Sequence, residues 1–291
     1  MPNDSSNPAA EARRLWTLLE PIHAVTYFSA AARDALADAG YRGFWMGYFA
    51  ARSAPLGRAA TPEVVESTFF GFSNSMVNRA LPDAWGFATP DAAIEARATS
   101  AAIALRQVVD DIEEHTRRAL PLLESAANAA RCHGRLLARC NQLLPRRDDP
   151  VERLWQAATT LREHRGDGHV AALVSAGLDG TESLILASKL AVGSADPLHL
   201  RQARGWTESE WDAGSDRLVE RGLLDESHHP TGEGTLAHAR LEHATDEAAI
   251  QPFRDGLTGD GLTLLATVLR PIAAGARSLL PFPNPIGLPK H

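Results

Sequence analysis

One run of the sequence is dense in side chains that perform acid–base chemistry. Residues 162–169 read Arg-Glu-His-Arg-Gly-Asp-Gly-His, so most of these side chains can ionise. Because Gly166 and Gly168 interrupt the run, we expect a connector between two apolar helices. A carboxylate beside an imidazole can orient it and adjust its pKa, as in acid–base sites. The predicted catalytic residues are His169, Asp167 and Arg162.

The same run has two other interpretations. It could be a solvated turn, in which Asp167 only caps the following helix. It could also bind a metal or haem through His169, although His164 and His169 are five residues apart and no other zinc-type spacing accompanies them. We therefore assign His164 to ligand binding and predict no metal residues. The chain contains no phosphate-binding loop, dinucleotide-binding loop or nucleophile elbow.

A second group of candidates lies within the first fifty or so residues. His23 stands on an otherwise apolar helical pattern, near Pro21, where we expect a kink or break. Three interpretations of His23 stay open: a partly buried structural histidine, a residue that contacts a ligand, or an axial ligand of haem. Tyr48 and Arg52 are four residues apart, so they share a helix face and could hold an anionic or carbonyl-bearing ligand. Trp45 and Phe49 complete this ligand-binding set, unless the aromatic stripe is only core.

The two cysteines indicate no disulfide. Cys132 and Cys140 fall eight residues apart on one predicted helix, roughly 12 Å along its axis, too far for a bond. Free thiols, a polar start without a signal-peptide pattern and the lack of a long apolar run predict a cytoplasmic protein that does not bind membranes.

The elements that must position these residues are predicted to be mainly α-helical. Start signals such as Thr-Pro-Glu at 61–63 and Thr-Pro-Asp at 89–91 precede apolar periodicity. The charged stretch 145–150 divides the chain into a helical domain, 11–145, with a possible ligand pocket, and a second domain, 150–277. We expect residues 1–10 and 281–291 to be flexible tails.

The second half carries a family resemblance. Arg-Gly-Trp-Thr-Glu-Ser-Glu-Trp at 204–211, Arg-Leu-Val-Glu-Arg-Gly-Leu-Leu at 217–224 and His-Pro-Thr-Gly-Glu-Gly at 229–234 resemble the MarR-type winged-helix module over about 181–250. Residues 223–231 are predicted to form a short two-stranded β-ribbon, in the place of the wing of such a module. The whole chain also resembles an uncharacterised family from high-GC bacteria, on motifs at 48–57, 161–169 and 241–246. No family activity can be transferred from it.

Charge argues against DNA as the partner of this module. In MarR-type proteins the third helix enters the major groove, which requires basic or neutral polar side chains. Residues 207–226 contain seven acidic side chains and two arginines, a net charge of -5 within a chain of net charge -7. An acidic helix is repelled by the phosphates before any base contact.

The sequence therefore predicts a cytoplasmic, small-molecule-binding bacterial protein, in which a pocket between the two domains performs acid–base chemistry without an organic cofactor. A ligand-responsive MarR-like regulator is the first alternative, and a haem or metal protein using His23 or His169 is the second. A structural partner in a biosynthetic complex and a homodimer also stay open.

Overall fold

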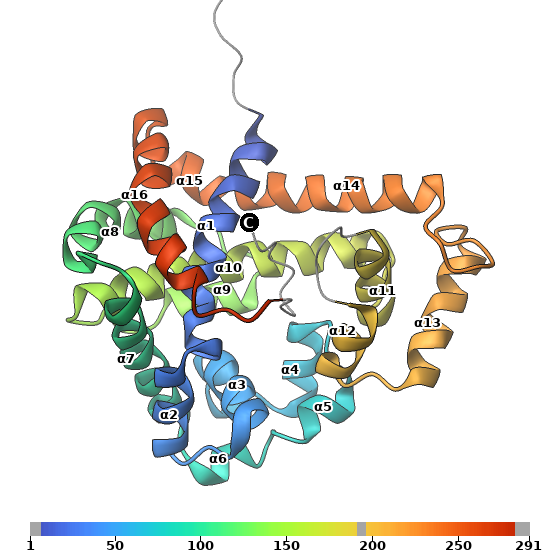
Figure 1. Ribbon diagram of the computed structural model, residues 1–291, viewed down its shortest axis with the longest axis horizontal. Coiled ribbons are helices and arrows are strands. Elements are labelled where there is room, and N and C mark those ends of the chain that lie inside the picture. The colour runs from blue at the N-terminus through green and yellow to red at the C-terminus, as the bar shows by residue number, and fades with distance from the viewer. Residues whose placement is uncertain (1–6, 191–195, 283–291) are drawn as a thin grey trace, which may run out of the picture.

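The computed structural model describes residues 7–190 and 196–282, and every regular element in these ranges is a helix (Figure 1). Mainly α is therefore correct. The helices are α1 (Pro8–Phe28), α2 (Ala30–Asp38), α3 (Gly43–Ser53), the 3-10 helix η1 (Ala54–Ala59), α4 (Pro62–Phe69), α5 (Asn74–Asn78), α6 (Ala84–Phe87), α7 (Pro90–Val108), α8 (Ile112–Ala129), α9 (Leu136–Gln142), α10 (Pro150–Ser175), α11 (Gly180–Leu190), α12 (Pro197–Arg204), α13 (Glu208–Glu220), α14 (Gly232–Ala249), α15 (Gln251–Gly256) and α16 (Gly259–Arg277).

The predicted β-ribbon is not formed, so the winged-helix expectation is wrong. The described residues contain no strand, and the segment between α13 and α14 holds only one isolated bridge, Leu224 with Pro230. Asp225 explains the difference, because its carboxylate accepts hydrogen bonds from the amides of Ser227 and His229 at 2.9 Å and closes a tight turn. Proline also lacks the N–H that would extend a ladder.

Residues 162–169 do not form a connector. They lie inside α10, which continues through both glycines. A glycine costs about 1 kcal/mol in a helix interior, and packing against α1, α8, α9 and α14 outweighs that cost. Gly168 also has a packing role, since a Cβ there would lie 2.4 Å from the guanidinium of Arg135. Likewise α1 continues through Pro21 without a break.

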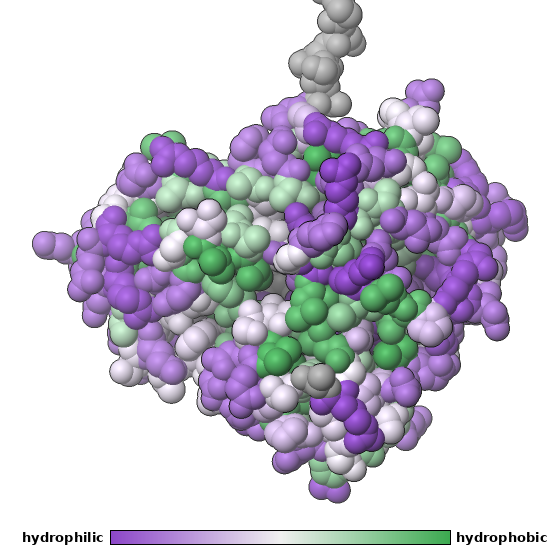
Figure 2. Space-filling view, turned by 180° about the vertical axis from the view of Figure 1, so that it is seen from behind, coloured by the Kyte–Doolittle hydropathy of each residue, from purple (hydrophilic) through white to green (hydrophobic). Residues whose placement is uncertain are grey.

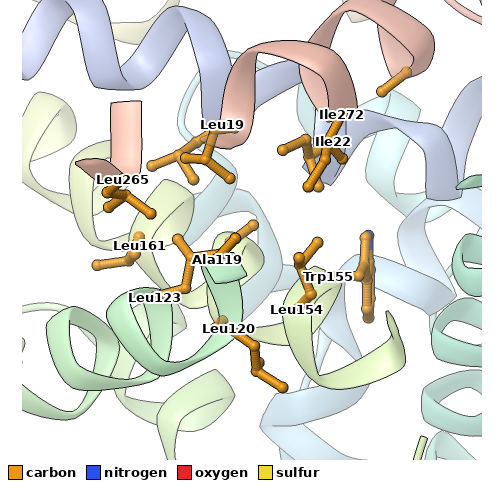
Figure 3. Packing of buried hydrophobic residues seen from close by; sticks show 14 of the residues in the cluster. Leu19, Ile22, Ala119, Leu120, Leu123, Leu154, Trp155, Leu161, Leu265 and Ile272 are labelled. Carbon is orange, nitrogen blue, oxygen red and sulfur yellow. The ribbon is translucent and has the colours of Figure 1, made fainter. Parts of the chain in front are cut away.

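The largest core brings together α1, α7, α8, α10 and α16 around the fully buried Trp155. Figure 3 shows Leu19 and Ile22 of α1 beside Leu265 and Ile272 of α16, with Leu123 of α8 facing them. Segments before and after residues 145–150 therefore share one core. The division into two domains at that point stays a prediction.

Two smaller cores flank the central one. An aromatic-rich core joins α2 to α7 around Phe49 and Phe72, and another joins the end of α10 to α11–α14. In Figure 1 α14 runs alongside α10 and α13 lies at the edge of the molecule. Thr207 and Glu210 form a capping box at the start of α13. Figure 2 shows hydrophobic residues gathered on part of the opposite face, with hydrophilic residues around them.

Most of the predicted tails, residues 1–6 and 283–291, lie outside the described residues, whereas Pro8 to Ala10 already belong to α1. Within the described ranges no single helix is long and apolar enough to cross a membrane. Taken together, the bent pair α10 and α11 has the required length and hydropathy.

Candidate functional site

Five ionisable side chains from three helices meet in the interior, and we call them the charged cluster. Short helical spacings position them: Glu20 and His23 are three residues apart on α1, and Arg162 and Glu163 are adjacent on α10. Arg52 enters from the end of α3. Glu20, His23 and Glu163 are each at most 2% exposed. Charges buried this deeply require partners.

The cluster is held by paired arginines and glutamates. Arg52 donates from Nε and Nη2 to the two Glu163 oxygens at 3.0 and 3.2 Å. Arg162 donates to Glu163 at 3.0 Å and to both Glu20 oxygens at 3.1 Å. Burial alone would raise the pKa of Glu163, but the two guanidinium groups hold it well below its usual value. The Glu163 carboxylate is therefore ionised at neutral pH.

His23 is the member of the cluster with an unused polar atom. Its Nδ1 lies 3.1 Å from the hydroxyl of Thr159, whereas its buried Nε2 has no hydrogen-bond partner among the described residues. Desolvation lowers the pKa of His23 well below its usual value, and Arg162 lowers it further. The ring is neutral at pH 7, so Nε2 can donate or accept one hydrogen bond with a bound molecule, depending on the tautomer.

Aromatic rings connect this interior to the surface, and we call Tyr27, Phe28, Phe44, Trp45 and Tyr48 the aromatic wall. Tyr27 packs edge-on against His23 with ring centroids 5.1 Å apart and lies 4.7 Å from Tyr48. The Tyr48 hydroxyl accepts a hydrogen bond from Arg52 at 3.4 Å. Phe44, at the outer end, is 39% exposed. A flat ligand could lie against these rings with its polar end toward Arg52.

The structure separates Asp167 from His169, because residues two apart on a helix point to different sides. Asp167 accepts a hydrogen bond from the Ala138 amide at 2.9 Å and so caps α9. His169 faces α14, where its Nδ1 lies 3.0 Å from the Thr245 hydroxyl. Burial raises the pKa of Asp167 to about 6 and lowers that of His169 to about 4. They form no acid–base pair.

The remaining predicted residues divide between the two regions. Arg162, His23, Tyr48 and Arg52 are brought together, whereas His164 points elsewhere, with its Nε2 3.3 Å from the Arg131 carbonyl. Trp45 belongs to the aromatic wall, but Phe49 is fully buried core.

Neither cysteine forms a disulfide, and burial raises the pKa of both thiols. The prediction that both cysteines lie on one helix is wrong, because Cys132 precedes α9 and only Cys140 lies within it.

Glu20 and Glu163 are not among the residues that the sequence predicts for a site. A local signal was present, because Glu20, His23 and Tyr27 recur at i, i+3 and i+7, the spacing of one helix face. Arg204, at the end of α12, was also missed. Its guanidinium lies 4.3 Å from the Phe72 ring centroid and hydrogen-bonds Tyr48. That contact joins segments about 150 residues apart, which no local pattern reveals.

Among the described residues, no three His, Cys, Asp or Glu side chains lie close enough together to bind a metal ion. His23 and His169 also do not face each other. Thr159, which contacts His23, lies ten residues before His169 on α10, roughly 15 Å along the axis.

A helix–turn–helix arrangement is formed by α12 and α13 with the turn at 205–207. The turn is docked on the N-terminal half: Ser73 hydrogen-bonds the carbonyls of Arg204 and Gly205, and Trp206 donates to the Gly71 carbonyl at 3.0 Å. The solvent-exposed residues of α13 include five carboxylates, Glu208, Glu210, Asp212, Asp216 and Glu220.

The two arginines at the C-terminal end of α13 pair with carboxylates on and just before α11. Arg217 pairs with Asp179 and Glu182, and Arg221 pairs with Glu182 at 3.2 Å. The acidic character predicted for this helix therefore extends to its surface.

Comparison with curated proteins and with solved structures gave no match. A family profile, described as a helix-turn-helix family, matches residues 12–281. The match covers nearly the whole chain, including the charged cluster and the α12–α13 pair, so this protein belongs to that helix-turn-helix family.

Proposed function

We propose that this protein binds a small organic molecule between the aromatic wall and the charged cluster. The observation that carries the proposal is the buried Nε2 of His23, which lacks a partner among the described residues. Leaving a buried polar atom unpaired costs roughly 1–3 kcal/mol, and a ligand that hydrogen-bonds it recovers this energy.

The charges and rings favour an aromatic carboxylate. Arg52 donates to the Tyr48 hydroxyl as well as to Glu163, so a guanidinium group reaches the inner end of the aromatic wall. A carboxylate can accept hydrogen bonds from that guanidinium group, and the rings of the wall offer a flat apolar surface.

The test compares 2-naphthoate with neutral 2-naphthamide by isothermal titration calorimetry. We expect saturable binding of the carboxylate and at least about tenfold weaker binding of the amide. Tyr48→Phe removes only the hydroxyl that Arg52 contacts and should weaken binding. Tyr41→Phe is the matched control, since Tyr41 bonds the Thr89 carbonyl at 2.9 Å, outside the cluster. Equal binding of both ligands, or equal effects of both variants, contradicts the proposal.

Acid–base catalysis is a second candidate for the same site. A neutral His23 can accept a proton at Nε2, and Arg52 and Arg162 would stabilise the developing oxyanion. The test follows exchange of the methylene protons of phenylpyruvate in deuterated water by NMR. Exchange above the buffer rate that is lost in His23→Gln supports catalysis, whereas exchange at the buffer rate leaves only binding.

We also propose that α13 does not read DNA, because its exposed carboxylates repel phosphates. A gel shift at about 50 mM salt with the DNA upstream of its own gene should show no complex. A sequence-specific shift there would instead support the alternative, a ligand-responsive regulator.

A further inference from the structure

A cavity of about 210 Å³ lies between α8, α9 and α10, apart from the charged cluster. Its lining comes from residues 124, 127 and 128 on α8, from residues 141, 142 and 144–147, and from α10. The α10 residues are Arg153, Gln156, Ala157 and Thr160, which occupy a different face of the helix from Thr159 and Arg162. The cavity is thus a separate site.

The inner end of the cavity is a rigid amide network. Gln156 donates from Nε2 to the carbonyl and side-chain oxygen of Asn141 at 3.3 and 3.2 Å. Arg97, which is 3% exposed, donates to both amide oxygens, at 2.8 Å to Asn141 and 3.3 Å to Gln156. These contacts fix the orientation of the two amides. Hydroxyl groups suit such a surface, because they can both donate and accept.

Arginines gather at the outer end of the cavity. Three arginines and one glutamate line the cavity. Arg153 binds Glu124 through two hydrogen bonds, and Arg147 pairs with Glu95 and Glu152. Arg146 differs, since its one ion pair with a described residue, Glu124, is 3.7 Å long and its side chain is 70% exposed. Its guanidinium can therefore turn toward an anion at the mouth.

We propose that this cavity binds a small anionic polyol, with the anion at Arg146 and the hydroxyls at Gln156, Asn141 and Thr160. A three-carbon phosphate ester fits the volume, and the amides and guanidinium groups of the lining can pair with its hydroxyls and its phosphate. The proposal is independent of the ligand proposed for the charged cluster.

The test titrates the whole protein with glycerol 3-phosphate by calorimetry at low salt. We expect saturable binding that is at least about tenfold weaker in Arg146→Ala. Arg117→Ala is the matched control: Arg117 is 71% exposed on α8 and also pairs with a glutamate, but it lies outside the cavity. It should bind as the unaltered protein does.

Ala157→Leu fills the cavity from α10 and should abolish binding. Asn128→Trp covers the mouth from an exposed position and serves if the first variant does not fold. Absence of saturable binding, unchanged affinity in Arg146→Ala, or binding retained in a folded blocking variant overturns the proposal. Equal affinity for inorganic phosphate overturns the role of the hydroxyls, and glycerol alone should not bind measurably.

Discussion

Asp167 shows how one buried carboxyl can oppose stability while making a useful contact. It caps α9 through the Ala138 amide, yet burial raises its pKa to about 6 from a usual value of 3.8. The folded state binds the proton more tightly than the unfolded chain does. This group therefore stabilises the fold at low pH, and that contribution is lost as the pH rises from about 4 through 6.

Asp167→Asn should consequently stabilise the protein at pH 7–8 by about 1–3 kcal/mol and change little at pH 4, because asparagine stays neutral and can accept the same hydrogen bond. Urea unfolding at both pH values measures this. Asp149→Asn provides a control of opposite sign, since Asp149 caps α10 and its pKa is lowered. A loss of stability at pH 8 in Asp167→Asn would contradict the argument.

Glu163 belongs to the opposite class of carboxyl group. Its pKa is held low by Arg52 and Arg162, so its stabilising contribution is present above the unfolded pKa and is lost as pH falls. Glu163→Gln leaves two buried guanidinium groups short of a counter-charge and should cost about 3–5 kcal/mol in urea unfolding at pH 7. Glu113→Gln, which breaks the exposed pair with Arg106, should cost at most about 1 kcal/mol. Similar losses in both variants would refute this.

At the scale of elements, α10 is the helix on which sequence and structure differ most. The glycines and charges of 162–169 have the composition of a turn, and only packing on several sides makes the segment helical. The α1 and α3 spacings were readable locally, as Tyr48 and Arg52 demonstrate. Which helix face meets which other helix depends on tertiary packing, so Glu163 as partner of Arg52 could not be predicted.

Gly166→Ala and Gly168→Ala test the helical state of this segment. A Cβ at position 166 would make ordinary contacts at 3.5 Å or more, so alanine should stabilise α10 by about 0.5–1 kcal/mol. At position 168 the Cβ would displace the Arg135 guanidinium, which bonds the His164 and Ala248 carbonyls, so that gain should be cancelled or reversed. Thermal unfolding of both variants compares them. Destabilisation by Gly166→Ala would indicate a turn.

At the scale of the whole molecule, the docked turn after α12 ties the two halves together beyond their shared core. Gly205 has φ +77, and a Cβ there would lie 2.6 Å from the Met76 side chain. The start signals and capping boxes were predictable because they are local. The placement of the helix–turn–helix pair against residues 71–76 was not, because it depends on contacts between distant segments.

Buried neutral histidines should set the response of the whole fold to acid. His23, His164 and His169 all have lowered pKa values, about 4 for the latter two. Such groups stabilise fully above the unfolded pKa of 6.5, and that contribution is lost as pH falls toward 4. These three histidines outnumber Asp167, whose contribution to the free energy of unfolding increases as the pH falls. The free energy of unfolding should therefore fall between pH 6.5 and 4, measured in urea.

His164→Asn should flatten this decline by about 1–2 kcal/mol, because His164 is 1% exposed and its ring must stay neutral in the fold. His169→Gln should flatten it less, since the His169 side chain is 32% exposed and water reaches a charged ring there. His199→Gln, at an exposed position on α12, is the control and should change the slope least. An equal effect of all three substitutions would mean that net charge, rather than buried imidazole, governs acid unfolding.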